Sequence, residues 1–203
     1  MPEPVIIVPY DPGWARDFES IRLRLAGALG DLALDILHVG STSVVGLAAK
    51  PIIDIDIVID RETALPAVIE RLATISYTFE GDRGVPGRYA FAAPRDLPRH
   101  HPYVCARDNL ELKRHVAFRD ILRANPQAAA AYGSLKYELA SHFGRDRDGY
   151  SRAKTEFVER ALTCACLQPC TTTCFASNQA PASLSSSGNF DLLEPFDRGR
   201  RSW

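Results

Sequence analysis

The chain has 203 residues, 46% of them hydrophobic, and its 24 Lys and Arg residues nearly balance 25 Asp and Glu residues, leaving a formal net charge of -1. This length and apolar content suit a single hydrophobic core followed by a tail. The near-neutral charge excludes an overall field that attracts nucleic acid or anionic lipid, and no apolar run approaches the roughly 20 residues of a bilayer-spanning helix. The first residues lack the basic and apolar regions of a signal peptide, so we expect a cytoplasmic protein with no membrane or nucleic-acid partner.

Helical and strand patterns alternate in the first half of the chain. Apolar side chains at helical spacing predict an amphipathic helix over residues 17–32. A second helix is predicted over residues 63–75, where Pro66 is tolerated because it falls in the first turn. Short apolar runs bounded by turn residues predict a sheet of about five strands, with the first two as neighbours, at residues 34–39, 51–59, 77–80, 88–92 and 101–106.

The second half of the chain changes to helical periodicity. Helices are predicted over residues 111–124, 127–143 and 150–162. Residues 163–203 are rich in Ser, Thr, Pro and Ala, so we predict a low-complexity, disordered tail after a folded domain of residues 1–162. The cysteines in this tail lack the paired C-x2-C spacing of a zinc site, and we expect reduced thiols at Cys164, Cys166, Cys170 and Cys174.

Two short motifs carry the chemistry. Gly40-Ser41 ends the strand at residues 34–39, and Asp54 and Asp56 follow after a spacer of 12 residues. Alternate side chains of a strand share a face, so the two carboxylates lie side by side, and a hard divalent cation such as Mg2+ relieves their repulsion. That cation would neutralise a nucleoside triphosphate, whose phosphates Gly40 and Ser41 are suited to approach. A solvated pair on an edge strand is the alternative, but the apolar flanks favour an interior strand.

The order of these motifs resembles the nucleotidyltransferase superfamily related to DNA polymerase β. Within it, the chain is similar to GrpB family proteins in the stretches PYDPGWARDFE at 9–19, HVGSTSVVGLAAKPIIDIDIV at 38–58, RHVAFRDILRANPQAAAAYGSLKYELA at 114–140 and YSRAKTEFVERAL at 150–162. The resemblance implies an α+β fold with a small mixed sheet backed by helices. It also implies nucleotide binding at Gly40, Ser41, Asp54 and Asp56, with two-metal transfer to an acceptor.

The third acidic position of that superfamily has no counterpart here. The expected strand reads His100-His101-Pro102-Tyr103, where related proteins carry His-x-His. His101 and Tyr103 share a face, and an imidazole can complete a metal shell or accept the proton of an attacking hydroxyl. We therefore include His101 among the catalytic residues, against the alternative of two half-buried strand side chains.

Cations are needed to meet a triphosphate. The resemblance suggests that Lys136 and Lys154, both on predicted helices, face the nucleotide, and Lys50 at the entrance to the second strand is a further candidate. His115 and His142 stand alone on helices, where packing is the commoner role, and they are left out of the site. Arg119 and Asp120 are expected to form a structural salt bridge.

These residues predict a Mg2+-dependent nucleotidyltransferase that moves AMP from ATP, or NMP from another nucleoside triphosphate, onto a hydroxyl group of a small molecule. The lack of a basic stripe argues against a polymerase. An acidic cleft would suit a polycationic acceptor, and by analogy with compact enzymes of the superfamily this points to an aminoglycoside antibiotic and resistance by adenylylation.

Two other function classes remain open. The first is a non-catalytic nucleotide or metabolite sensor that lost turnover with the third acidic position. The second is a coenzyme A related partner domain, because GrpB-like domains also occur fused to dephospho-coenzyme A kinases. This chain has no G-x4-G-K-[ST] loop of its own, so it is not that kinase by itself.

Overall fold

The computed structural model describes residues 4–167. The predicted tail from residue 168 onward, with Cys170 and Cys174, lies outside the described residues. Helix α5 continues to Leu167, five residues beyond the predicted helix end at Leu162, so Cys164 belongs to this helix. No helix in the described part of the chain is both long and apolar enough to cross a membrane.

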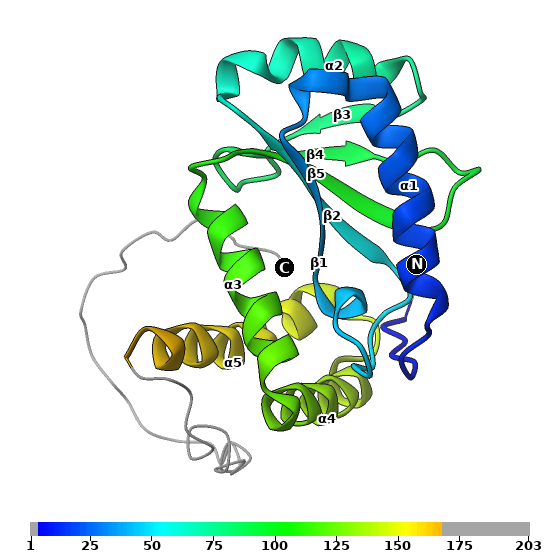
Figure 1. The fold of residues 1–203 in the computed structure, drawn as a ribbon. Helices are drawn as coiled ribbons and strands as arrows, with labels where there is room; N and C mark the ends of the chain where they lie inside the picture. The colour runs from blue at the N-terminus through cyan, green and yellow to red at the C-terminus, as the bar shows by residue number, and fades with distance from the viewer. Residues whose placement is uncertain (1–3, 168–203) are drawn as a thin grey trace, which may run out of the picture.

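The strands form one mixed sheet in the order β1-β2-β5-β4-β3 (Figure 1). Strands β2 and β5 run parallel, and the other neighbouring pairs are antiparallel. The strands are β1 (Asp35–Val39), β2 (Ile53–Ile59), β3 (Thr78–Gly81), β4 (Arg88–Ala92) and β5 (His100–Ala106). This sheet confirms the predicted α+β class, the five strands and the neighbouring positions of the first two.

The helices are α1 (Gly13–Leu29), α2 (Leu65–Ala73), α3 (Leu110–Ala124), α4 (Pro126–Phe143) and α5 (Arg147–Leu167). Helix α1 begins four residues before the predicted start, because Oδ1 of Asp11 accepts a hydrogen bond from the Gly13 amide at 2.7 Å and opens the first turn there. Asn109 and Asn125 cap α3 and α4 by accepting from the amides of Leu112 and Ala128.

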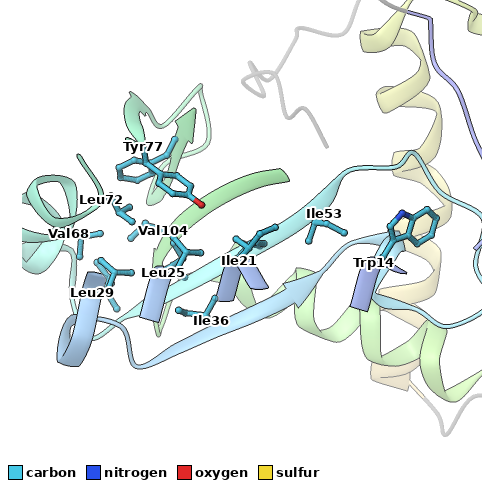
Figure 2. Close-up of a cluster of buried hydrophobic side chains, with 14 of the residues drawn as sticks. Trp14, Ile21, Leu25, Leu29, Ile36, Ile53, Val68, Leu72, Tyr77 and Val104 are labelled. Atoms are coloured by element: carbon cyan, nitrogen blue, oxygen red, sulfur yellow. The ribbon is translucent and has the colours of Figure 1, made fainter. Parts of the chain in front are cut away.

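Helices α1 and α2 cover one face of the sheet. The side chains of Ile53, Ile55, Ile57 and Ile59 point to this face and belong to the largest buried cluster. Figure 2 shows Ile21, Leu25 and Leu29 of α1 beside the strands, with the α2 side chains Val68 and Leu72 continuing the same layer. This layer buries one side of β2 and leaves Asp54 and Asp56 on the other side.

The opposite face of the sheet meets the helical second half. Leu112 and Val116 of α3 pack against Val58 and Cys105, and this contact holds α3 across the ends of β2 and β5. A further cluster joins the loop after β1 to the last three helices through Val44, Leu47, Leu122, Ala128, Tyr132 and Phe157. Together these contacts bring the loop after β1, strand β2 and the last three helices close to one another.

Candidate nucleotide and metal site

Asp54 and Asp56 lie on an interior strand, since β2 is paired with β1 on one side and β5 on the other. This pairing rules out the edge-strand alternative. The side chain of Asp54 is 37% exposed, whereas that of Asp56 is fully buried. The two carboxylates therefore share a face of the sheet, as predicted, but only Asp54 opens to solvent.

Gly40 turns the chain directly beside Asp54. Its φ of 68° is in the left-handed region that favours glycine. A β-carbon at this position would also lie 3.0 Å from Cβ of Asp54 and collide with its carboxylate. The following 3-10 turn, η2 (Ser41–Ser43), is closed by Ser43 Oγ, which donates to the Gly40 carbonyl at 2.6 Å. A backbone without a side chain is thus packed against the first carboxylate.

His101 and Tyr103 lie opposite the two carboxylates in the parallel pairing of β2 with β5. His101 Nδ1 is 3.2 Å from Oδ1 of Asp54. Tyr103 is covered by the guanidinium of Arg88, 4.4 Å from its ring centroid, and burial raises the pKa of its hydroxyl to about 12. The predicted shared face is therefore present, with His101 in contact with Asp54.

His115 also belongs to the site, although its isolated position in the sequence suggested otherwise. Its Nδ1 lies 2.8 Å from Oδ2 of Asp56, so the expectation of simple helix packing is wrong. Two further residues follow at intervals of four along α3. Arg119 donates to the His38 carbonyl at 3.2 Å, and Arg123 donates to the Ser43 carbonyl from Nε at 3.1 Å and from NH2 at 2.8 Å. Three side chains on one face of α3 thus form hydrogen bonds to β2, β1 and the turn after Gly40.

The spacing of these residues was the signal that could have identified them. His115, Arg119 and Arg123 stand at positions i, i+4 and i+8, which share one face of a helix. The salt bridge predicted between Arg119 and Asp120 is present at 2.7 Å, next to the contact with His38. His142 lies apart from the site, packed against the Phe143 ring on α4.

Three lysines lie near one another in the site, two of them on α4 and α5 and one in the loop after β1. Lys136 is buried, and its ammonium donates to the Ala48 carbonyl in the loop after β1. Lys50 and Lys154 each place Nζ 4.5 Å from the ring centroid of Tyr150. The Tyr150 ring offsets part of the repulsion between the two ammonium groups.

Burial disfavours the charged forms of Lys136 and Lys154. It lowers the pKa of Lys136 to about 7, and the neighbouring Lys154 adds to this effect. The pKa of Lys154 falls to about 8 for the same reason, helped by Lys50 and opposed by Asp54. An anion bound between these groups would favour their charged forms and recover part of that cost.

Most of these groups line one cleft of about 460 Å³, a size in the range of small-molecule sites. Of the residues named above, it is lined by Gly40, Ser41, Lys50, Asp54, Arg88, His101, Tyr103, His115, Tyr132, Lys136, Tyr150 and Lys154. The expected acidic cleft is not found. The described lining carries five basic side chains, Lys50, Arg83, Arg88, Lys136 and Lys154, against the carboxylates Asp54 and Asp148.

The carboxylates fit a hard cation in one specific respect. Oδ1 of Asp56 is buried and has no hydrogen-bond partner among the described residues. A buried acceptor without a partner costs about 1–3 kcal/mol, and more when it is charged. A divalent cation held by Asp54 and Asp56 would give this oxygen a partner and offset that cost. Within residues 4–167 no three His, Cys, Asp or Glu side chains form a metal-binding group, so water and phosphate oxygens would complete the shell.

Comparison with known proteins places the chain in a family. The family model described as GrpB protein matches residues 4–163. The protein YqkA of Bacillus subtilis is 34% identical over 157 residues, covering 77% of this chain and 46% of that protein. The crystal structure of the conserved protein GrpB from Enterococcus faecalis superposes with a TM-score of 0.70 at 34% identity, covering 78% of this chain and 98% of that one.

A longer relative contains a similar segment. Dephospho-CoA kinase of Mycobacterium bovis is 31% identical over 176 residues, covering 74% of this chain and 43% of that protein. The chain therefore spans less than half of the length of both this kinase and YqkA.

Proposed function

The chain belongs to the GrpB family, and from its cleft we propose that it is a Mg2+-dependent nucleotidyltransferase acting on a hydroxyl group of a small molecule. The observation that carries the proposal is the packing of the Gly40 turn against Asp54, beside the buried and unpartnered Oδ1 of Asp56 in the described chain. A carboxylate pair next to a bare backbone turn suits the metal and phosphates of a nucleoside triphosphate.

In the proposed reaction, the acceptor oxygen forms a bond to the α-phosphorus of the triphosphate, most simply ATP. The bond from the α-phosphorus to the oxygen bridging it to the β-phosphorus breaks, and pyrophosphate leaves. Mg2+ at Asp54 and Asp56 would polarise the α-phosphate and lower the pKa of the acceptor hydroxyl. His101, next to Asp54 at the mouth of the cleft, takes the hydroxyl proton in this scheme.

The helical side of the cleft suits the remaining phosphates. Lys136, Lys154 and Lys50 bring three amino groups into the cleft from α4, α5 and the loop after β1, whereas Asp54 enters it from β2. The Ser41 hydroxyl, in the turn after Gly40, lies where it can donate to a phosphate oxygen. This division assigns the β- and γ-phosphates to the lysines and the reacting α-phosphate to the carboxylate end.

The charge of the side chains that line the cleft indicates which class of acceptor can bind. Five basic side chains in the lining disfavour a polycationic molecule such as an aminoglycoside. We therefore propose a neutral or anionic acceptor with a free hydroxyl. The kinship with a dephospho-CoA kinase segment supports placing coenzyme A related compounds among the anionic candidates.

A non-catalytic nucleotide sensor is the second candidate. Asp54 and Asp56 belong to no group of three His, Cys, Asp or Glu side chains suited to a metal ion among the described residues. This favours the sensor, because a second metal ion would be weakly held. Both functions require binding of a nucleotide, and only the nucleotidyltransferase then transfers a nucleoside monophosphate to an acceptor.

Mass spectrometry separates the candidates. Purified protein is incubated with ATP, Mg2+ and three acceptor groups: aminoglycosides, neutral polyols, and anionic hydroxyl compounds including dephospho-coenzyme A. The proposal predicts a neutral or anionic acceptor that gains one AMP with release of pyrophosphate, and no product from an Asp54→Asn, Asp56→Asn double variant. Binding of ATP with no acceptor modified would favour the sensor, and a modified aminoglycoside would contradict the proposed acceptor class.

A further inference from the structure

His115 is the one polar contact of the buried carboxylate within the described chain. Its Nδ1 lies 2.8 Å from Oδ2 of Asp56, and its side chain is 12% exposed at the border of the cleft. In the tautomer that carries the proton on Nδ1, the imidazole donates and Oδ2 of Asp56 accepts. The pair joins α3 to β2 over 59 residues of sequence.

The backbone of α3 holds this histidine in place. Leu112 and Val116, one on each side of His115 along the helix, pack against Val58 and Cys105 of the sheet. Asn109 caps the helix, with its side chain accepting from the Leu112 amide at 3.1 Å. One turn further on, Arg119 bonds the His38 carbonyl of β1. His115 therefore reaches Asp56 from a segment fixed at both ends.

The two oxygens of Asp56 differ as a result. Oδ2 is occupied by His115, whereas Oδ1 is buried without a hydrogen-bond partner in the described part of the chain. The terminal torsion of an aspartate is soft, so an unattached carboxylate can rotate and present its oxygens interchangeably. A hydrogen bond to one oxygen removes that freedom and leaves the other for a ligand.

We propose that His115 is a positioning residue, which holds Oδ2 of Asp56 and thereby presents Oδ1 to the divalent cation of the nucleotide complex. This inference rests on the proposed Mg2+ and nucleotide site. Hydrogen-bond partners behind a metal ligand typically change metal affinity by about 10-fold to 100-fold when they are removed. His115 acts through Asp56 and has no contact with the reacting atoms in this assignment.

Two polar substitutions separate positioning from packing. His115→Asn places an amide nitrogen where Nδ1 stands, and His115→Gln moves the amide beyond it. His142→Gln, on α4 outside the cleft, is the matched control. The probe is Mn2+ with ATP, and free Mn2+ is measured by electron paramagnetic resonance. Thermal unfolding in EDTA is recorded for each variant.

The inference predicts that His115→Gln binds Mn2+ with ATP about 10-fold to 100-fold more weakly, while His115→Asn stays within about threefold of the unsubstituted chain. The control is expected to bind normally. Equal binding by His115→Gln, or equal weakening by both His115 variants, would overturn the positioning role. No Mn2+ binding by the unsubstituted chain with ATP would overturn the proposed function and this inference with it.

Discussion

Gly40 and Asp54 pack so closely that no side chain fits at Gly40. A β-carbon there would lie 3.0 Å from both Cβ and Cγ of Asp54, and the φ of 68° is unfavourable for any other residue. The two residues come from a turn and a strand separated by the loop that also carries Lys50. Their contact brings the bare backbone and the first carboxylate together.

Gly40→Ala should therefore disrupt the site. We expect a loss of about 1–3 kcal/mol in the free energy of unfolding, because the added β-carbon strains the backbone and displaces Asp54. Affinity for ATP with Mg2+ should fall at least about tenfold as the carboxylate moves. Urea unfolding and calorimetric titration measure the two effects.

Gly27→Ala is the matched control for that substitution. Gly27 lies on the exposed side of α1, and a methyl group added there would meet open space. Alanine should therefore stabilise the helix by about 0.5–1 kcal/mol and leave ATP binding unchanged. Equal effects of the two substitutions on ATP binding would contradict the role given to the Gly40 contact.

Arg123→Met should loosen the turn after Gly40. The guanidinium makes two hydrogen bonds to the Ser43 carbonyl, but its side chain is 45% exposed, so we expect a loss of only about 0.5–1.5 kcal/mol in stability. Affinity for ATP with Mg2+ should fall by roughly threefold to tenfold, since Ser41 and Gly40 lie in the same turn.

Arg22→Met is the comparison for Arg123→Met. Arg22 forms an exposed ion pair with Glu19 on α1, away from the cleft. Loss of this ion pair should change the free energy of unfolding and the affinity for ATP little. Calorimetric titration of each variant with ATP gives the affinities. The same ATP affinity for both variants would show that the turn does not depend on α3.

Lys136 should make stability depend on pH in a defined window. Its folded-state pKa of about 7 is below its ordinary value of 10.5, so between these values the unfolded chain binds more protons than the folded chain. The free energy of unfolding should then rise with pH in this window, by at most about 1.4 kcal/mol per pH unit for this one group. Lys154 adds a similar rise above its pKa of about 8.

Lys136→Met removes the contribution of Lys136 to the pH dependence of the free energy of unfolding. The advantage of the variant over the unsubstituted chain should be largest near pH 6.5 and should shrink as the pH rises to 9.5. Urea unfolding at four pH values, followed by the fluorescence of the buried Trp14, provides the test. A difference that stays constant over the whole range would mean that Lys136 is fully charged in the folded chain.

Local patterns were enough to predict most of the fold. The β-branched run of β2 and the apolar stripes of the helices act over a few neighbouring residues, so their positions follow from spacing alone. The start of α1 was missed because it is set by a single hydrogen bond, which the Asp11 side chain accepts from the Gly13 amide. Helix ends depend on such individual contacts, which periodicity does not record.

The site was predicted less completely, since it depends on contacts between distant segments. Asp54 and Asp56 could be paired because the strand repeat places them on one face. The contact of His115 with Asp56 depends on which face of α3 lies on the sheet, and that is decided by Leu112 and Val116 meeting Val58 and Cys105. The lysines of the cleft were among the predicted phosphate-binding residues, but Arg83 and Arg88 were not, because these two arginines join the lysines only in the folded chain.

We propose above all that Asp54 and Asp56 bind a nucleoside triphosphate through Mg2+. Calorimetric titration with ATP, in Mg2+ and in EDTA, tests it most directly, with Asp54→Asn and Asp56→Asn beside the unsubstituted chain. We expect binding that requires Mg2+ and that either substitution weakens by about tenfold or more. Absence of binding, or binding that neither EDTA nor the two substitutions change, would contradict it.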